Sequence, residues 1–147
     1  MIDIAYDRKE RIYKWTEPES GEVLTAPSGA PSKAALFQTA VAMTNPELWE
    51  AAARWIGEEP YLERAIWKGV ELVVNDGVEL FDLNGRLLAL VQSSDEYGRY
   101  GVSNIDGYVV CECPHYQDGG AAIDRLGQKT CKHIAAYRLA QTQESRF

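Results

Sequence analysis

The residues best suited to chemistry are three cysteines and a histidine near the end of the chain. They follow the pattern C-x-C, a gap of seventeen residues, then C-x-H, and they include every cysteine of the 147-residue protein: Cys111, Cys113, Cys131 and His133. Thiolate sulfur and imidazole nitrogen are the ligands that Zn²⁺ prefers in closed tetrahedral sites. We therefore expect these four residues to bind one structural Zn²⁺.

The spacing of these ligands predicts the elements that position them. Cys111 and Cys113 are two residues apart, so along an extended strand both side chains would lie on one face. Cys131 and His133 open a predicted helix, whose cap we expect to be Thr130. The apolar stripe of that helix is Cys131, Ile134, Ala135 and Leu139. The positive end of the helix dipole favours a thiolate at Cys131.

These motifs resemble those of a SWIM-type zinc finger. The resemblance rests on C-x-C-P at Cys111–Pro114, on C-K-H at Cys131–His133 and on the short apolar helix that follows, and it covers about residues 65 to 140. It implies a β-β-α metal fold that is not itself catalytic. Such modules occur in transposases, chromatin-remodelling ATPases, recombination-associated proteins and ubiquitin-pathway proteins. The resemblance therefore implies a partner that is DNA or another protein.

His115 is a second candidate for the histidine ligand, because it lies two residues after Cys113. We favour His133, because the SWIM-like pattern places the fourth ligand beside Cys131, and because Pro114 turns the chain away after Cys113. The alternative leaves His133 out of the site and His115 in it.

Catalysis is not expected at this site. Four protein ligands leave no open position for water or substrate, which a catalytic zinc needs. The sequence also lacks the H-x-E pattern of zinc deaminases, a G-x-x-x-x-G-K phosphate loop and a G-x-S-x-G elbow. A redox pair at Cys111 and Cys113 explains the neighbouring C-x-H less well than a metal does. We expect a protein that is not an enzyme.

The charge of the chain argues against a general duplex binder. Fifteen Lys and Arg against 22 Asp and Glu give a net charge of −7, whereas phosphate contacts require a basic surface. Basic residues near the second ligand pair are the candidates for nucleic-acid contact: Arg125, Lys129, Lys132 and Arg138. The alternative is that these residues belong to a mixed, solvated surface.

Residues 1–32 are predicted to form an N-terminal arm or hairpin together with a small-residue linker at Ala26–Pro31. Basic and aromatic residues alternate in this segment, an arrangement that can hold a nucleic-acid strand by charge and stacking: Arg8, Lys9, Arg11, Tyr13, Lys14 and Trp15. Acidic neighbours dilute the charge, so this use is the weaker hypothesis.

The rest of the chain predicts an α+β fold in two regions. Residues 33–76 should form three helices, with starts at Ser32, Asn45 and Pro60. Residues 77–147 should form a small antiparallel sheet and a C-terminal helix joined by the zinc site. The expected strands are 78–83 and 86–92 around Asn84-Gly85, then 99–103 and 108–110, followed by a loop over 114–129.

Function follows from the metal motif more than from any other feature. We expect a zinc-stabilised binding module acting in a nucleic-acid-associated assembly of recombination, transposition or defence. The alternative is a protein–protein adaptor that does not contact nucleic acid. No apolar run of about eighteen residues or secretory leader is evident, and thiolates suit a reducing compartment, so we expect a cytoplasmic protein without membrane contact.

Overall fold

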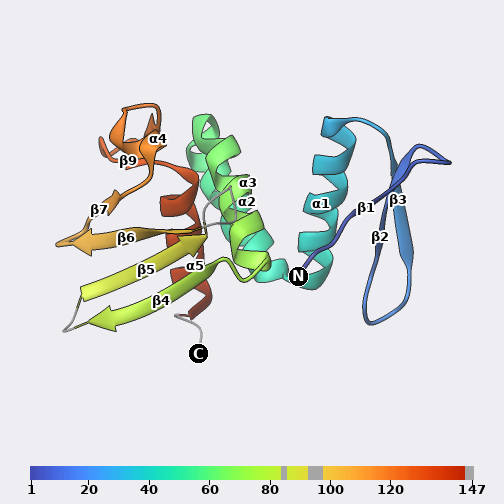
Figure 1. Cartoon of the computed structure of the whole chain (residues 1–147), viewed down its shortest axis with the longest axis horizontal. Helices are drawn as coiled ribbons and strands as arrows, with labels where there is room; N and C mark the ends of the chain where they lie inside the picture. Colours follow the sequence, from blue (N-terminus) through green and yellow to red (C-terminus); the bar gives the residue numbers. More distant parts are fainter. Residues whose placement is uncertain (84–85, 93–97, 145–147) are drawn as a thin grey trace. The chain divides into compact units, whose positions relative to one another are not determined.

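The computed structural model describes residues 1–83, 86–92 and 98–144 (Figure 1). The chain divides into two compact units, residues 1–50 and residues 51–147. The sequence predicts domain boundaries after residues 32 and 76, where the expected type of secondary structure changes. These boundaries remain a prediction. The architecture mixes helices with antiparallel sheets, as expected.

The first unit contains a three-stranded antiparallel sheet and a helix. The strands are β1 (Ala5–Asp7), β2 (Ile12–Thr16) and β3 (Val23–Pro27), and the helix is α1 (Ala30–Thr44). Trp15 of β2 packs with two residues of α1, Leu36 and Ala40, to form the core of this unit. The hydrophobic faces of one helix and one small sheet therefore bury each other.

Two sequence predictions in this unit are wrong. The predicted linker is largely structured, because β3 extends through Pro27 and α1 begins at Ala30. Gly29, with φ of 127°, precedes the helix in place of a Ser32 cap. Trp15 is buried, so its ring is not available to stack on a nucleic-acid base. Lys14 forms an ion pair with Asp7 at 3.1 Å, which also weakens the hypothesis of a basic arm.

Two further helices follow α1, as predicted, and a 3₁₀ turn at Pro60 precedes the second of them. These elements are α2 (Pro46–Glu58), the 3₁₀ turn η1 (Pro60–Leu62) and α3 (Glu63–Val74). The predicted cap of α2 is confirmed, because the Asn45 Oδ1 atom accepts a hydrogen bond from the Leu48 N–H at 3.2 Å. None of the described helices is long and apolar enough to cross a membrane.

The second unit is built around a four-stranded antiparallel sheet in the order β4-β5-β6-β7. Its strands are β4 (Val78–Leu83), β5 (Arg86–Gln92), β6 (Arg99–Ile105) and β7 (Tyr108–Cys111). The bounds of β4 and β5 are those predicted, although the predicted Asn84-Gly85 turn lies outside the described residues. Strand β7 is at an edge of the sheet and ends at the first predicted metal ligand, Cys111.

Helix α5 (Lys132–Glu144) crosses one face of this sheet and also packs against α3 (Figure 1). It contacts all four strands of the sheet. Its buried side chains include Ile134 and Tyr137, which meet Val91 and Val102 of the sheet in one apolar cluster. The start of α5, where the second ligand pair lies, is therefore fixed by the core of this unit.

Gly69 allows α3 and α5 to approach closely. A Cβ atom at this position would lie 2.8 Å from the Ala136 backbone nitrogen and 3.0 Å from the Ala135 carbonyl carbon. Neither atom can move without shifting α5 as a whole. The absence of a side chain at Gly69 is therefore a packing requirement, and it sets the distance of α5 from α3.

We predict that Gly69→Ala lowers the free energy of unfolding by roughly 1–3 kcal/mol, because overpacking outweighs the better helix propensity of alanine. Gly57→Ala in α2 is the matched control, because a Cβ atom there meets nothing within 4 Å. Urea unfolding of both variants measures the difference. A Gly69→Ala protein as stable as Gly57→Ala would contradict the close contact.

Candidate metal centre

The first ligand pair lies at the end of the edge strand β7. Cys111 is the last residue of β7, and the Glu112 N–H donates to the Gly101 carbonyl at 3.1 Å, which extends the pairing by one residue. The Cys113 N–H then donates to the Cys111 Sγ atom at 3.4 Å. This bond turns the chain so that both sulfurs lie on the same side.

A short helical turn follows the first pair. Cys113 caps α4 (Pro114–Gln117), and its Sγ atom accepts a hydrogen bond from the Tyr116 N–H at 3.4 Å. Backbone N–H groups directed at sulfur favour the thiolate form. The Gln117 side chain donates to the Cys111 carbonyl at 2.9 Å, which ties the turn back to β7.

The predicted loop over 114–129 therefore contains regular structure. Besides α4, it holds the two-stranded pair β8 (Ala122–Ile123) and β9 (Lys129–Thr130). A seventeen-residue connection with no helical or strand periodicity looks like a loop in the sequence. Its structure comes from contacts with other segments rather than from its own pattern.

The second ligand pair lies at the start of α5, as predicted. The Ala135 N–H donates to the Cys131 carbonyl at 2.9 Å, so Cys131 stands at the N-cap position. The prediction that Thr130 caps this helix is wrong, because the Thr130 hydroxyl donates instead to the Gln128 carbonyl at 3.3 Å. The cysteine takes the cap position, and His133 lies in the first turn.

All four predicted ligands converge and can hold a metal ion. One ligand atom from each of Cys111, Cys113, Cys131 and His133 lies within 4.8 Å of the others. The four residues are between 1% and 3% exposed. With Zn–S near 2.3 Å and Zn–N near 2.0 Å, tetrahedral ligand atoms stand roughly 3.5–3.8 Å apart, so the ligand atoms would approach one another by at most about 1 Å on binding.

The histidine of this set behaves as a ligand should. The Nδ1 atom of His133 lies 3.9 Å from the Cys131 Sγ atom. Its other ring nitrogen, Nε2, is buried and has no hydrogen-bond partner among the described residues. A buried imidazole with a ring nitrogen this close to a cysteine sulfur fits a metal-binding role.

The three thiols do not ionise alike. The hydrogen bond from the Cys111 thiol, helped by His133 and by the Ile134 N–H, lowers the pKa of Cys131 to about 4 despite burial. The same bond to Cys131, together with burial, raises the pKa of Cys111. Burial likewise raises the pKa of Cys113. One thiolate forms readily, and further ionisation of the cluster needs a cation among the sulfurs.

The alternative ligand, His115, lies outside this cluster. His115 is on the exposed side of α4, and a Cβ atom at Gly120 would meet its ring at 3.1 Å. Among the described residues, the group that can hold a metal contains His133 instead. The preference for His133 from the position of Pro114 therefore agrees with the geometry.

Gln128 joins the two ligand-bearing segments through its side chain. Its amide donates to the Val109 carbonyl at 2.7 Å and accepts from the Val109 N–H at 3.1 Å. This two-way pairing satisfies the outer edge of β7, as a neighbouring strand would. Gln128 is only 6% exposed, so these bonds form away from water. The segment that leads to Cys131 is thereby held against the strand that carries Cys111.

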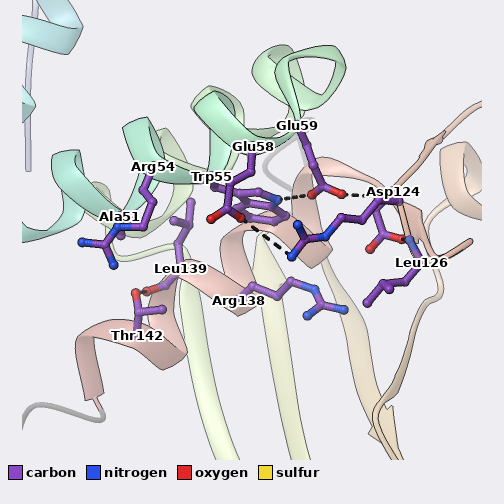
Figure 2. Close-up of a pocket in the computed structure, with 11 residues that line it drawn as sticks. Ala51, Arg54, Trp55, Glu58, Glu59, Asp124, Leu126, Arg138, Leu139 and Thr142 are labelled. Carbon is purple, nitrogen blue, oxygen red and sulfur yellow. Dashed lines mark hydrogen bonds and ion pairs between the residues drawn. The ribbon is translucent and has the colours of Figure 1, made fainter.

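Glu59 also holds this segment, through the backbone of Arg125 (Figure 2). Its carboxylate accepts hydrogen bonds from the Arg125 N–H at 2.8 Å, the Trp55 indole at 2.7 Å and the Tyr61 hydroxyl at 3.2 Å. Burial alone would raise the pKa of Glu59, but these three donors outweigh it and lower the pKa below its ordinary value of 4.5. The end of α2 is thus fastened to the connection between the ligand pairs.

The four basic candidates for nucleic-acid contact do not form one patch. Arg125 pairs with Glu58 at 3.9 Å, and Arg138 extends along the same pocket toward Asp124 and Leu126 (Figure 2). Lys129 lies over the Tyr116 ring, 5.3 Å from its centroid. Lys132 lines a different pocket, beside the metal ligands. The structure therefore does not bring these cations together.

Sequence reasoning missed Gln128 and Glu59. A glutamine in a polar connection carries no signal that its amide will pair with a strand edge. Glu59 does carry a weak one, since it lies between the helix stop at Gly57 and the helix start at Pro60, where backbone N–H groups are unpaired.

Comparison of the chain with models of known protein families, with curated proteins and with solved structures returns no match.

We predict that Glu59→Gln lowers the free energy of unfolding at pH 7 by about 1–3 kcal/mol, because three donors lose a charged, buried acceptor. Since the pKa of Glu59 is lowered in the folded protein, this stabilisation is full at pH values above 4.5 and is lost as the pH falls through the lowered pKa. Urea unfolding of both proteins between pH 7 and pH 3.5 should show the difference shrinking only below 4.5.

Glu58→Gln is the matched control, because Glu58 is exposed and forms only a long ion pair, at 3.9 Å, with the exposed Arg125 side chain. Its effect should stay within about 0.5 kcal/mol at every pH. Equal effects of the two substitutions would show that Glu59 does not fasten the connection.

Proposed function

We propose that this protein is a non-catalytic binding module whose fold is stabilised by one structural Zn²⁺. The observation that carries the proposal is the convergence of three thiols and one imidazole, all buried, from the two ends of a single connection. The ion would join the end of β7 to the start of α5. The chemistry it supplies is charge compensation for the thiolates.

The donor set supports zinc over other cations. Sulfur with nitrogen in a tetrahedral arrangement favours Zn²⁺, whereas Mg²⁺ and Ca²⁺ require oxygen ligands. The order of ligands is also that of the SWIM-like pattern. Four protein donors complete the coordination of a tetrahedral ion, which leaves no place for a substrate and supports a role other than catalysis. Thiolates that must stay reduced support a cytoplasmic location.

A nucleic-acid-associated assembly is the setting we propose for the module. The SWIM-like resemblance supports this setting, while the charge of −7 opposes extended contact with a duplex. The scattered positions of Arg125, Lys129, Lys132 and Arg138 oppose it further. Association with nucleic acid would therefore be local or would run through another subunit.

A protein–protein adaptor is the second candidate, and one feature favours it. The connection between the ligand pairs presents two exposed apolar side chains, Ile123 at 56% and Leu126 at 85% exposure. Both are held near the fold by neighbours that are themselves fixed, since Arg125 and Gln128 make the hydrogen bonds described above. Fixed apolar side chains of this kind can anchor a protein partner.

We predict that the purified protein contains one equivalent of zinc, and that His133→Ala loses most of it. His115→Ala is the matched control and should keep the full equivalent, because His115 lies outside the cluster. Elemental analysis measures the metal. A zinc content far below one equivalent in the unaltered protein would contradict the proposal.

Removal of zinc with a strong chelator should expose the amides around the site. Structural zinc contributes on the order of 10–16 kcal/mol in small zinc-binding peptides, so its loss should open β7, the connection and the first turn of α5. Hydrogen exchange with and without chelator should show lost protection there and unchanged protection in residues 1–50. Unchanged exchange at the start of α5 would count against a structural ion.

We predict that a short DNA duplex binds weakly and with a shallow dependence on salt, because the four candidate cations lie apart. Four cations acting together would give a slope of about −3.6 for the logarithm of affinity against the logarithm of salt concentration. Fluorescence anisotropy at two salt concentrations measures it. A steep slope that disappears in a protein with Lys129→Glu, Lys132→Glu and Arg138→Glu would restore direct duplex contact.

A further inference from the structure

A pocket of about 670 Å³ lies beside the metal ligands in the second unit. One wall is formed by η1 and the first half of α3, through Tyr61, Arg64 and Lys68. The opposite wall is formed by the metal-binding segments, from Cys113 to His115 and from Thr130 to His133. The volume is within the range of pockets that bind small molecules.

The charged side chains around this pocket are all basic. Arg64 and Lys68 are contributed by α3, and Lys132 by the first turn of α5. Among the described residues, no aspartate or glutamate lines the pocket. This is unusual in a protein with seven more acidic than basic residues, because random placement would put carboxylates nearby.

The geometry of α3 aims two of these cations at one place. Arg64 and Lys68 are four residues apart, so they lie on the same face of the helix, one turn from each other. Both are exposed, and neither takes part in any ion pair found among the described residues. Two like charges held one turn apart repel each other, and an anion between them would remove that repulsion.

A second pocket of this unit differs in the charge of the side chains that line it. The pocket of Figure 2, about 330 Å³, is lined by Arg54, Arg125 and Arg138 but also by Glu58, Glu59 and Asp124. The basic side chains of this pocket therefore have carboxylates nearby. The pocket beside the metal has basic residues without acidic ones, which makes it the better place for an anion.

The positions of the pocket walls are fixed by the rest of the fold. The Tyr61 hydroxyl donates a hydrogen bond to the buried Glu59 carboxylate. The centroids of the Tyr100 and His133 rings lie 5.0 Å apart. Lys132 sits between two metal ligands, so its backbone is held by the site itself. A zinc ion with three thiolates would contribute a charge of −1, which is smaller than the combined charge of Arg64 and Lys68.

We propose that this pocket binds the phosphate group of a phosphorylated small molecule or of a nucleic-acid strand end. Arg64 would hold phosphate oxygens through its planar set of donors, and Lys68 and Lys132 would add charge. The pocket exceeds the size of a bare phosphate, so the ligand carries a further group, which would lie toward the exposed Tyr61 ring. This inference rests on the proposed function, because the residues that would hold the metal form part of one wall of the pocket.

Isothermal titration calorimetry of the full chain tests the proposal, with zinc content measured first. The probes are AMP, adenosine, inorganic phosphate and a short single-stranded oligonucleotide with and without a 5′-phosphate. AMP should bind at least tenfold more tightly than adenosine. Arg64→Gln and Lys68→Gln should each weaken AMP binding about tenfold. In NMR spectra of the same titration, the backbone amide signals of Arg64, Lys68 and Lys132 should shift.

Arg86→Gln is the matched control, because Arg86 is an exposed cation of β5 that does not line the pocket. It should leave AMP affinity unchanged. Tighter binding of the 5′-phosphorylated strand than of AMP identifies a strand end as the source, and equal or weaker binding identifies a free phosphorylated molecule. Both outcomes support the phosphate site.

Equal affinity for AMP and adenosine, or equal effects of Arg86→Gln and Arg64→Gln, would overturn the phosphate site. No binding of AMP by protein that holds one equivalent of zinc would overturn it as well, while leaving the zinc-stabilised module intact. Protein that folds but holds no zinc would overturn the proposed function instead, so the two failures are distinguishable.

Discussion

Three buried thiols cannot all ionise in an apolar core unless a cation lies among them. In this protein the constraint falls on Cys111, Cys113 and Cys131, whose sulfurs are brought together from two distant segments. A hydrogen bond from Cys111 already supports one thiolate at Cys131. The remaining charge would have to be compensated from outside the chain, and the four ligands are placed so that one ion between β7 and α5 can do this.

Packing and polar contacts place the two ligand pairs independently of any ion. The tight approach of α3 and α5 at Gly69 sets the position of the second pair, and the register of β6 with β7 sets the first. Gln128 and Glu59 then secure the connection between them. Because all these contacts belong to one unit, a ligand atom needs to move little to meet a metal.

The sequence was most informative where regular periodicity or metal-ligand chemistry was involved. The four ligands, the Asn45 cap and the strands at 78–83 and 86–92 could be read from residue type and spacing, because each depends on neighbours in the chain. The Gln128 pairing could not, since it depends on which strand edge lies nearby after folding. The same holds for the basic candidates: proximity in sequence to Cys131 did not place Arg125 and Lys132 on one surface, because Arg125 lies in the pocket that Arg138 lines, whereas Lys132 lines the pocket beside the metal ligands.

The side chain of Gln128 also has a protective consequence. An uncovered outer strand offers its free N–H and C=O groups as a template for the strands of other molecules, and this is how many β-proteins begin to aggregate. Here a single amide occupies that position on β7 at Val109, and it does so from the segment that the metal ligands hold in place. If the site binds the ion that we propose, loss of that ion would expose this edge of the sheet, and metal-free protein would self-associate before it unfolds completely.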